Sequence, residues 1–201
     1  MRLIMDETCR IRRRTRGTVW GMARVAVLLR GVNVGRAKRV PMADFRDLLA
    51  DLGFTGTRTL LNSGNAVGDA PKGAARAHAS RIHDALVERL SVDVAVIVKT
   101  AADLQAILAE NPFAGKALDP SRVLVAFAPD AAALASLTPI EALVKRPEAF
   151  VVGAHAAYLS CPDGILTSKA GEALLGKVGR QATTRNWATV LKLEALLSAA
   201  E

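Results

Sequence analysis

Apolar and polar positions alternate along the chain with two periods, which predict short strands separated by amphipathic helices. Residues 24–29, RVAVLL, are almost continuously apolar, as is typical of a buried strand. In residues 41–52 apolar side chains recur at i, i+3, i+4 and i+7 from Phe45, which predicts a helix that ends at Gly53. Similar patterns predict strands at 58–61, 66–68 and 92–98, a turn at 62–65 and a second helix at 71–90.

The order of elements repeats after residue 100, although no residue-level repeat accompanies it. After a connecting helix at 100–110 we expect a strand at 122–128, a helix at 130–137, a hairpin formed by 149–152 and 156–160, a helix at 168–177, a short strand at 181–183 and a final helix at 186–199. The order βαββαβ is that of the ferredoxin-like fold. The sequence therefore predicts an α+β protein with two tandem ferredoxin-like plaits, residues 22–100 and 101–201. Each is expected to be an antiparallel sheet with helices on one face, and a C-terminal helix follows.

The net charge of +8 is divided between a short N-terminal segment and the rest of the chain. Residues 1–21 hold six arginines against Asp6 and Glu7, so they account for +4, and the remaining 180 residues account for the other +4. This segment has no apolar periodicity, and we expect it to be a disordered extension. It is either a basic arm that binds nucleic acid or a stretch upstream of the true start at Met22.

The composition excludes several classes of protein. With 51% hydrophobic residues the chain is expected to form packed domains, yet no apolar run reaches the roughly 18 residues of a membrane helix. The start lacks the apolar block of a secretory signal, so we expect a cytoplasmic protein. Neither the cysteines nor the histidines show disulfide or metal-ligand spacing, and we expect no metal and no cofactor; these residues are Cys9, Cys161, His78, His83 and His155.

The stretch LLRGVNVGRAKRVPM, residues 28–42, holds the strongest candidate chemistry. The first predicted strand leads into a glycine-containing loop with several cations, and Pro41 then begins a helix. Glycine loops and helix starts present free backbone N–H groups, so this arrangement suits an anion such as a phosphate. It is not a Walker P-loop, because no Gly-Lys-Ser/Thr follows. The alternative is a solvated connection in which the glycines only turn the chain.

Two other stretches carry polar side chains of the same kind. The turn at 63–65, Ser-Gly-Asn, would contribute to a site only if it lies beside the first loop, and Asn-Gly turns are common in hairpins. If a helix begins near residue 186, then Arg185, Thr189 and Lys192 lie at 0, +4 and +7 on one face near its N-terminus. Such a face would hold a phosphate or carboxylate, or it would be a solvent-facing helix end.

Together with CPDGILTSKAG at 161–171, these stretches resemble a bacterial family known as domain of unknown function 1697. The similarity extends from residue 23 to about residue 197. It implies a two-domain α/β plait fold, and the family has no established activity. The motif positions that the resemblance marks are Arg30, Gly31, Asn33, Gly35, Ser63, Gly64, Asn65, Ser168, Lys169, Arg185, Asn186, Trp187, Thr189 and Lys192.

The sequence favours binding of a phosphate-bearing ligand, a nucleotide or a nucleic acid. The alternatives are an enzyme that acts on a small anionic metabolite and a protein-interaction module in which the motifs only hold the two halves together. Adjacent helix residues do not face each other, so Ser168 and Lys169 do not suggest a catalytic pair. No catalytic residues and no oligomeric state follow from the sequence. The candidate ligand-binding residues are Arg30, Gly31, Asn33, Gly35, Lys38, Ser63, Asn65, Lys169, Arg185, Asn186, Thr189 and Lys192.

Overall fold

The structure, a computed structural model, describes residues 23–35, 38–115 and 118–199. These residues form two four-stranded antiparallel sheets with six α-helices and two short 3-10 helices. The expected N-terminal extension, residues 1–21 with Cys9, lies outside the described residues. None of the helices in the described ranges is long and apolar enough to cross a membrane.

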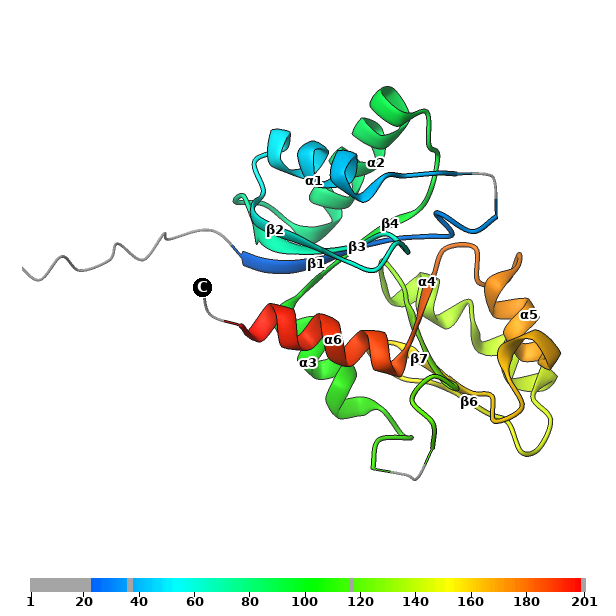
Figure 1. The fold of residues 1–201 in the computed structure, drawn as a ribbon. Helices are drawn as coiled ribbons and strands as arrows, with labels where there is room; N and C mark the ends of the chain where they lie inside the picture. The colour runs from blue at the N-terminus through cyan, green and yellow to red at the C-terminus, as the bar shows by residue number, and fades with distance from the viewer. Residues whose placement is uncertain (1–22, 36–37, 116–117, 200–201) are drawn as a thin grey trace, which may run out of the picture.

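The first half contains one sheet and two helices (Figure 1). Its strand order is β2-β3-β1-β4, and every neighbouring pair is antiparallel. The predicted apolar strand, β1, lies in the centre of the sheet, where it pairs with both β3 and β4. The elements are β1 (Ala23–Leu29), α1 (Met42–Asp51), β2 (Thr55–Leu60), β3 (Asn65–Ala70), α2 (Ala75–Leu90) and β4 (Val96–Thr100).

The second half repeats this arrangement in the order β6-β7-β5-β8, again with antiparallel neighbours. Helix α3 (Ala101–Glu110) connects the two halves, and a capping box formed by Thr100 and Asp103 begins it. The remaining elements are β5 (Val123–Phe127), α4 (Ala131–Ala135), η1 (Thr138–Leu143), β6 (Ala149–Val152), β7 (Ala157–Ser160), η2 (Ile165–Thr167), α5 (Lys169–Leu175), β8 (Thr183–Asn186) and α6 (Trp187–Ser198).

The two sheets and the helices form successive layers with three apolar cores. Alternate side chains of β1, such as Val27 and Leu29, pack under α1 and α2, because successive residues of a strand point to opposite faces. The other face of the same strand, with Ala26 and Leu28, belongs to a middle core that also includes α3, α6 and β5. The third core lies between the outer face of the second sheet and helices α4, η1 and α5.

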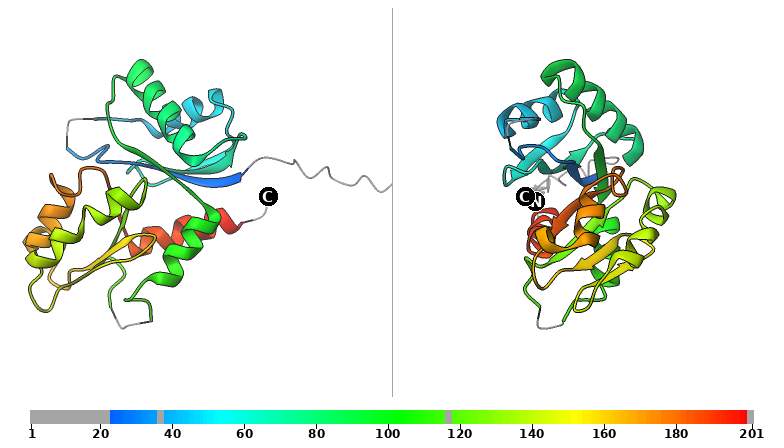
Figure 2. Two further views of the ribbon diagram at one scale, coloured as in Figure 1. Left: turned by 180° about the vertical axis from the view of Figure 1, so that it is seen from behind. Right: turned by 90° about the vertical axis from the view of Figure 1, so that its right-hand side faces the viewer.

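The two helices within each half lie on one face of its sheet, as expected, but the opposite face is covered as well. Helices α1 and α2 cover one face of the first sheet, whereas α3 and α6 cover its other face, as two further views show (Figure 2). The same two helices also pack against the second sheet. Both helices carry apolar side chains that are buried between the sheets: Leu104 and Ile107 on α3, and Leu193 and Leu197 on α6. Burial between the sheets removes these side chains from water, which stabilises the fold.

Several predicted boundaries shift. Strand β8 begins at Thr183 rather than at residue 181 and extends to Asn186, because its partners on β5 run from Phe127 back to Leu124. Residues 183–186, TTRN, are all polar and show no alternation of apolar and polar side chains, so the sequence could not place this strand. Similarly, β4 is later than predicted: residues 92 and 94 are buried but precede the strand.

Candidate functional site

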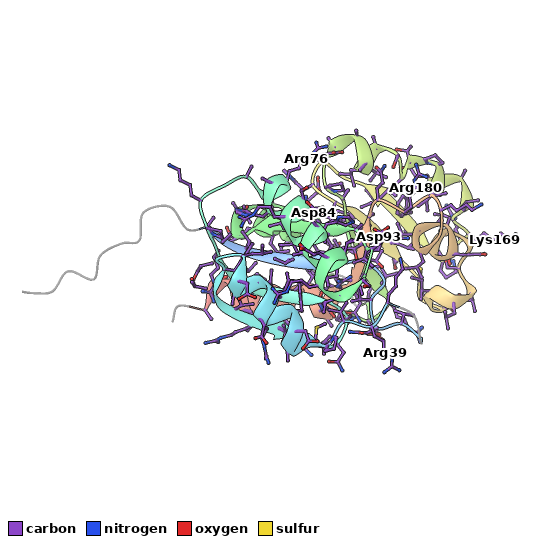
Figure 3. All side chains as sticks on the ribbon, turned by 90° about the horizontal axis from the view of Figure 1, so that it is seen from above. Arg39, Arg76, Asp84, Asp93, Lys169 and Arg180 are labelled. Atoms are coloured by element: carbon purple, nitrogen blue, oxygen red, sulfur yellow. The ribbon has the colours of Figure 1, made fainter. Side chains whose placement is uncertain are left out.

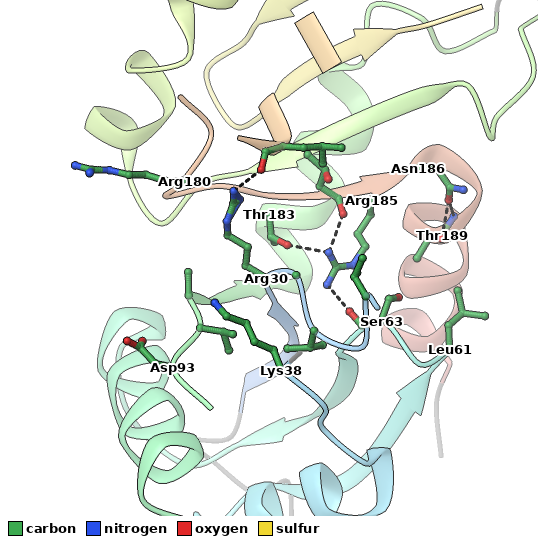
Figure 4. A pocket seen from close by; sticks show the side chains of 17 residues that line it. Arg30, Lys38, Leu61, Ser63, Asp93, Arg180, Thr183, Arg185, Asn186 and Thr189 are labelled. Atoms are coloured by element: carbon green, nitrogen blue, oxygen red, sulfur yellow. Dashed lines mark hydrogen bonds between the residues drawn. The ribbon is translucent and has the colours of Figure 1, made fainter. Parts of the chain in front are cut away.

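A cleft of about 690 Å³ lies between the two halves. The first half supplies the loop after β1, the turn between β2 and β3, and the segment before β4, whereas the second half supplies the end of α5, β8 with the connection before it, and the start of α6. Figure 4 shows the cleft from close by. Its lining residues are Arg30, Gly31, Val32, Val34, Lys38, Leu61, Ser63, Asp93, Val94, Ala95, Leu175, Arg180, Thr183, Thr184, Arg185, Asn186 and Thr189.

Arg185 lies at the bottom of the cleft and links the two halves. All of its N–H groups donate hydrogen bonds to neutral acceptors of the protein. Nε donates to the Asn65 side chain, Nη1 donates to Thr183 Oγ1 at 2.8 Å and to Thr184 O at 2.7 Å, and Nη2 donates to Leu29 O at 2.8 Å and to Ser63 O at 3.0 Å. A guanidinium has five N–H groups, so none is left for a ligand.

The charge of Arg185 is nevertheless unusual in its surroundings. The residue is only 8% exposed, and burial lowers the pKa of its guanidinium to about 10, which leaves it protonated at neutral pH. No carboxylate of the described residues accepts a hydrogen bond from it or pairs with it. Its positive charge is therefore compensated by dipoles alone.

Arg30 makes a second link between the halves. It follows β1, and its Nη1 donates to Gly179 O at 3.0 Å and to Ala182 O at 2.8 Å. Its Nη2 donates to Leu175 O at 2.8 Å and to Gly176 O at 3.2 Å, the carbonyls that end α5. The last carbonyls of a helix lack intrahelical partners, and a cation is favourable there.

The loops of the first half are fixed by asparagine side chains. Asn33 exchanges hydrogen bonds with Val40, donating to its carbonyl and accepting from its N–H, both at 2.9 Å, and it also donates to Asn62 O. Asn65 is fully buried and donates to Leu60 O and Ser63 Oγ. These bonds hold the loop after β1 and the β2–β3 turn side by side.

Gly64 shows why this turn needs a glycine. Its φ is +72°, and a Cβ there would lie 2.6 Å from the Val32 side chain and 2.7 Å from that of Leu29. A residue with a Cβ could neither adopt this backbone conformation nor pack this closely without strain. The close approach places the Gly64 carbonyl on the Leu29 N–H at 2.8 Å.

Two cations of the cleft remain free within the described part of the chain. The Lys38 ammonium and the Arg180 guanidinium make no hydrogen bond or ion pair with the described residues, and Figure 4 shows both on the side of the cleft away from Leu61. The carboxylate that lines the cleft, Asp93, lies 3.1 Å from His83 Nε2. Among the described residues, four cationic side chains and one carboxylate thus line the cleft, and this carboxylate is hydrogen-bonded to His83.

The structure divides the sequence-predicted site residues into three groups. Seven line the cleft: Arg30, Gly31, Lys38, Ser63, Arg185, Asn186 and Thr189. Asn33 and Gly35 line a neighbouring hollow of about 350 Å³, and Asn65 lies buried behind Arg185. Lys169 and Lys192 are exposed and do not line the cleft; Lys169 lies at the edge of the molecule, away from Arg180 and Asp93 (Figure 3).

The expected line of Arg185, Thr189 and Lys192 on one helix face is wrong. Arg185 belongs to β8 and points inward, whereas α6 begins after it at Trp187. Asn186 caps the helix by accepting from the Thr189 N–H at 2.9 Å, and it also accepts from the Thr189 hydroxyl. Trp187 packs partly buried against the middle core.

Sequence reasoning missed Arg180, Asp93, Leu61 and Thr183. Arg180 stands in a connection without a motif, and Asp93 lies in a stretch whose apolar residues predict a strand, so no local pattern marks either as a site residue. In the described ranges the histidine, cysteine and carboxylate side chains form no group of three or more that could hold a metal ion.

Comparisons with known proteins agree with this architecture. The conserved bacterial protein SP0830 from Streptococcus pneumoniae has a solved structure that is similar to this chain, with a TM-score of 0.75, 22% sequence identity, and coverage of 89% of this chain and 100% of that one. No curated protein sequence matches the chain. Residues 22–158 match the family described as "Protein of unknown function (DUF1697)", and the chain belongs to this family.

Proposed function

We propose that the cleft between the two halves binds the anionic group of a small molecule. The observation that carries this proposal is the charge of the cleft: among the described residues that line it, Arg30, Lys38, Arg180 and Arg185 are cationic and Asp93 is the one carboxylate. Like charges held close together repel, so a bound anion would lower the free energy of this arrangement. The volume of about 690 Å³ is in the range of small-molecule sites.

The four cations would act in two ways. Because Arg30 and Arg185 donate to protein carbonyls, they would attract an anion through their charge from the bottom of the cleft. The free side chains of Lys38 and Arg180 would supply the direct hydrogen bonds. A charge-assisted hydrogen bond contributes about 1.5–3 kcal/mol, so each should change the affinity by roughly tenfold or more.

The proposal is tested by thermal unfolding and calorimetry with inorganic phosphate, with chloride at equal ionic strength as the reference. At about 100 times its dissociation constant, phosphate should add roughly 2.7 kcal/mol to the free energy of unfolding. Lys38→Gln and Arg180→Gln should each weaken phosphate binding about tenfold.

Lys169→Gln and Lys192→Gln are matched controls, because both lysines are exposed cations that lie outside the cleft. They should bind phosphate as the wild type does. Equal stabilisation by chloride and phosphate, or equal losses in all four variants, would show that the cleft is not an anion site.

We also propose that the two halves, residues 22–100 and 101–201, are tandem ferredoxin-like plaits. The support is their strand order: β2-β3-β1-β4 and β6-β7-β5-β8 are the same order when each half is counted from its own first strand. Each half also inserts one helix after its first strand and one before its last strand. Comparison of the two halves by superposition of their Cα atoms tests this duplication.

A further inference from the structure

Resting on the proposed function, we propose that the ligand of the cleft is a phosphorylated organic molecule with an apolar group, and that Leu61 binds this group. The cleft is not uniformly charged. Several apolar side chains line it together with the cations, and three of them are strongly exposed: Val34 at 73%, Leu61 at 54% and Leu175 at 47%. An inorganic ion would leave all of this apolar surface in water.

Leu61 is held in the cleft by its neighbours rather than by packing of its own. The side chain is not part of any of the three cores. Its backbone has φ = 58°, a left-handed conformation that is unfavourable for a bulky residue. The residues on both sides are fixed, because Leu60 O accepts from Asn65 and Asn62 O accepts from Asn33. A fixed left-handed turn therefore presents a leucine to the cleft.

Within the cleft, Leu61 lies apart from the two free cations. Figure 4 shows Arg180, Lys38 and Asp93 on one side, and Leu61 on the other side beside Asn186 and Thr189 at the start of α6. Arg185 lies between them. A ligand that reached both sides would place its anion at Lys38 and Arg180 and its apolar group at Leu61.

The polar groups near Leu61 are neutral hydrogen-bond donors. Asn186 uses its side-chain oxygen for Thr189, which leaves its amide NH₂ without a hydrogen bond to the described residues. The Ser63 hydroxyl accepts from Asn65 and retains its own O–H for donation. Few placed polar groups beside apolar surface are typical of sites for organic molecules.

The test compares the calorimetric dissociation constants of phenyl phosphate and inorganic phosphate for the whole chain. In the wild type, phenyl phosphate should bind about tenfold more tightly. Leu61→Asn should reduce this ratio to about twofold while the constant for inorganic phosphate stays the same. Asparagine tolerates the left-handed backbone, so the turn is preserved in this variant. Leu166→Asn, at a leucine that is 95% exposed and outside the cleft, should keep the wild-type ratio.

The ratio separates this inference from the proposed function. If both compounds bind equally to the wild type, or if Leu61→Asn keeps the tenfold ratio, the role of Leu61 is wrong while the anion site stands. If neither compound binds, the proposed function fails. Tighter binding of a single-stranded oligonucleotide than of phenyl phosphate, with affinity falling steeply as salt rises, would identify a polymer as the ligand and overturn the inference.

Discussion

Arg185 shows how one side chain can look like a ligand residue and hold the protein together instead. Its contacts extend to β1, to the Ser63–Asn65 turn and to its own strand, so it connects both sheets. A charged group that is buried without a carboxylate is costly unless every donor is satisfied. Here every donor is satisfied, which makes the side chain structural whatever its charge adds to the cleft.

We expect Arg185→Lys to destabilise the protein strongly. Lysine has three donors on one atom and cannot reach acceptors in several directions, so buried acceptors of both halves would lose their partners. A buried acceptor left without a partner costs about 1–3 kcal/mol, so the loss of a few of them should cost about 3–5 kcal/mol, which corresponds to a fall in melting temperature of roughly 6–20 °C for a chain of this size. Differential scanning calorimetry measures it.

Arg58→Lys is the control, because Arg58 is an exposed arginine on β2 that makes no side-chain hydrogen bond with the described residues. Its melting temperature should be close to that of the wild type. A similar value for Arg185→Lys would mean that the contacts of Arg185 are dispensable.

At the scale of elements, Glu110 connects the end of α3 to the β6–β7 hairpin. Its carboxylate accepts hydrogen bonds from the N–H groups of Ala154 and His155 and from the Tyr158 hydroxyl. Burial raises the pKa of Glu110, but these hydrogen bonds lower it further than burial raises it, so the net pKa lies below its ordinary value of 4.5.

This pKa shift predicts the pH dependence of stability. A group with a lowered folded-state pKa contributes stability above its unfolded pKa and loses it as pH falls through the folded pKa. The difference in free energy of unfolding between the wild type and Glu110→Gln should therefore be constant from about pH 6 to pH 8 and should shrink below about pH 4.5. Urea unfolding at several pH values measures it, and a difference that does not depend on pH would contradict the assignment.

At the scale of the whole molecule, the middle core makes the two halves dependent on each other. The first sheet turns Ala26, Leu28, Val67 and Ile97 toward α3 and α6, both of which follow residue 100 in the chain. Apolar surface of this kind is stable only when it is covered. Element order suggests two domains, but the packing joins them.

We expect residues 23–100 expressed alone to be unstable or to associate, because that fragment lacks the helices that cover its inner face. Residues 23–199 should unfold in one cooperative transition, seen at the same urea concentration by circular dichroism and by tryptophan fluorescence. Trp187 reports on the middle core in this experiment. A monomeric, cooperatively folded fragment, or two separate transitions, would show that the halves are independent.

Much of the fold could be predicted from the sequence because the relevant signals are local. Apolar periodicity located β1 and α1, and element order predicted the antiparallel sheets that the structure contains. Strand β8 was misplaced because its residues are polar, and their strand geometry comes from pairing with β5. The coverage of both sheet faces could not be read from the sequence either, since a helix pattern does not state which surface it covers.

The sequence by itself determined the order of elements, the family and seven of the residues that line the cleft. Only the tertiary structure decided what those residues do there. The N–H groups of Arg30 and Arg185 donate hydrogen bonds to carbonyls that lie up to 156 positions away in the chain. Lys38 and Arg180 make no such bonds with the described residues. Whether a cation is free or satisfied depends on acceptors within about 3 Å in space. Residues far apart in the chain meet at that distance only when the fold brings them together.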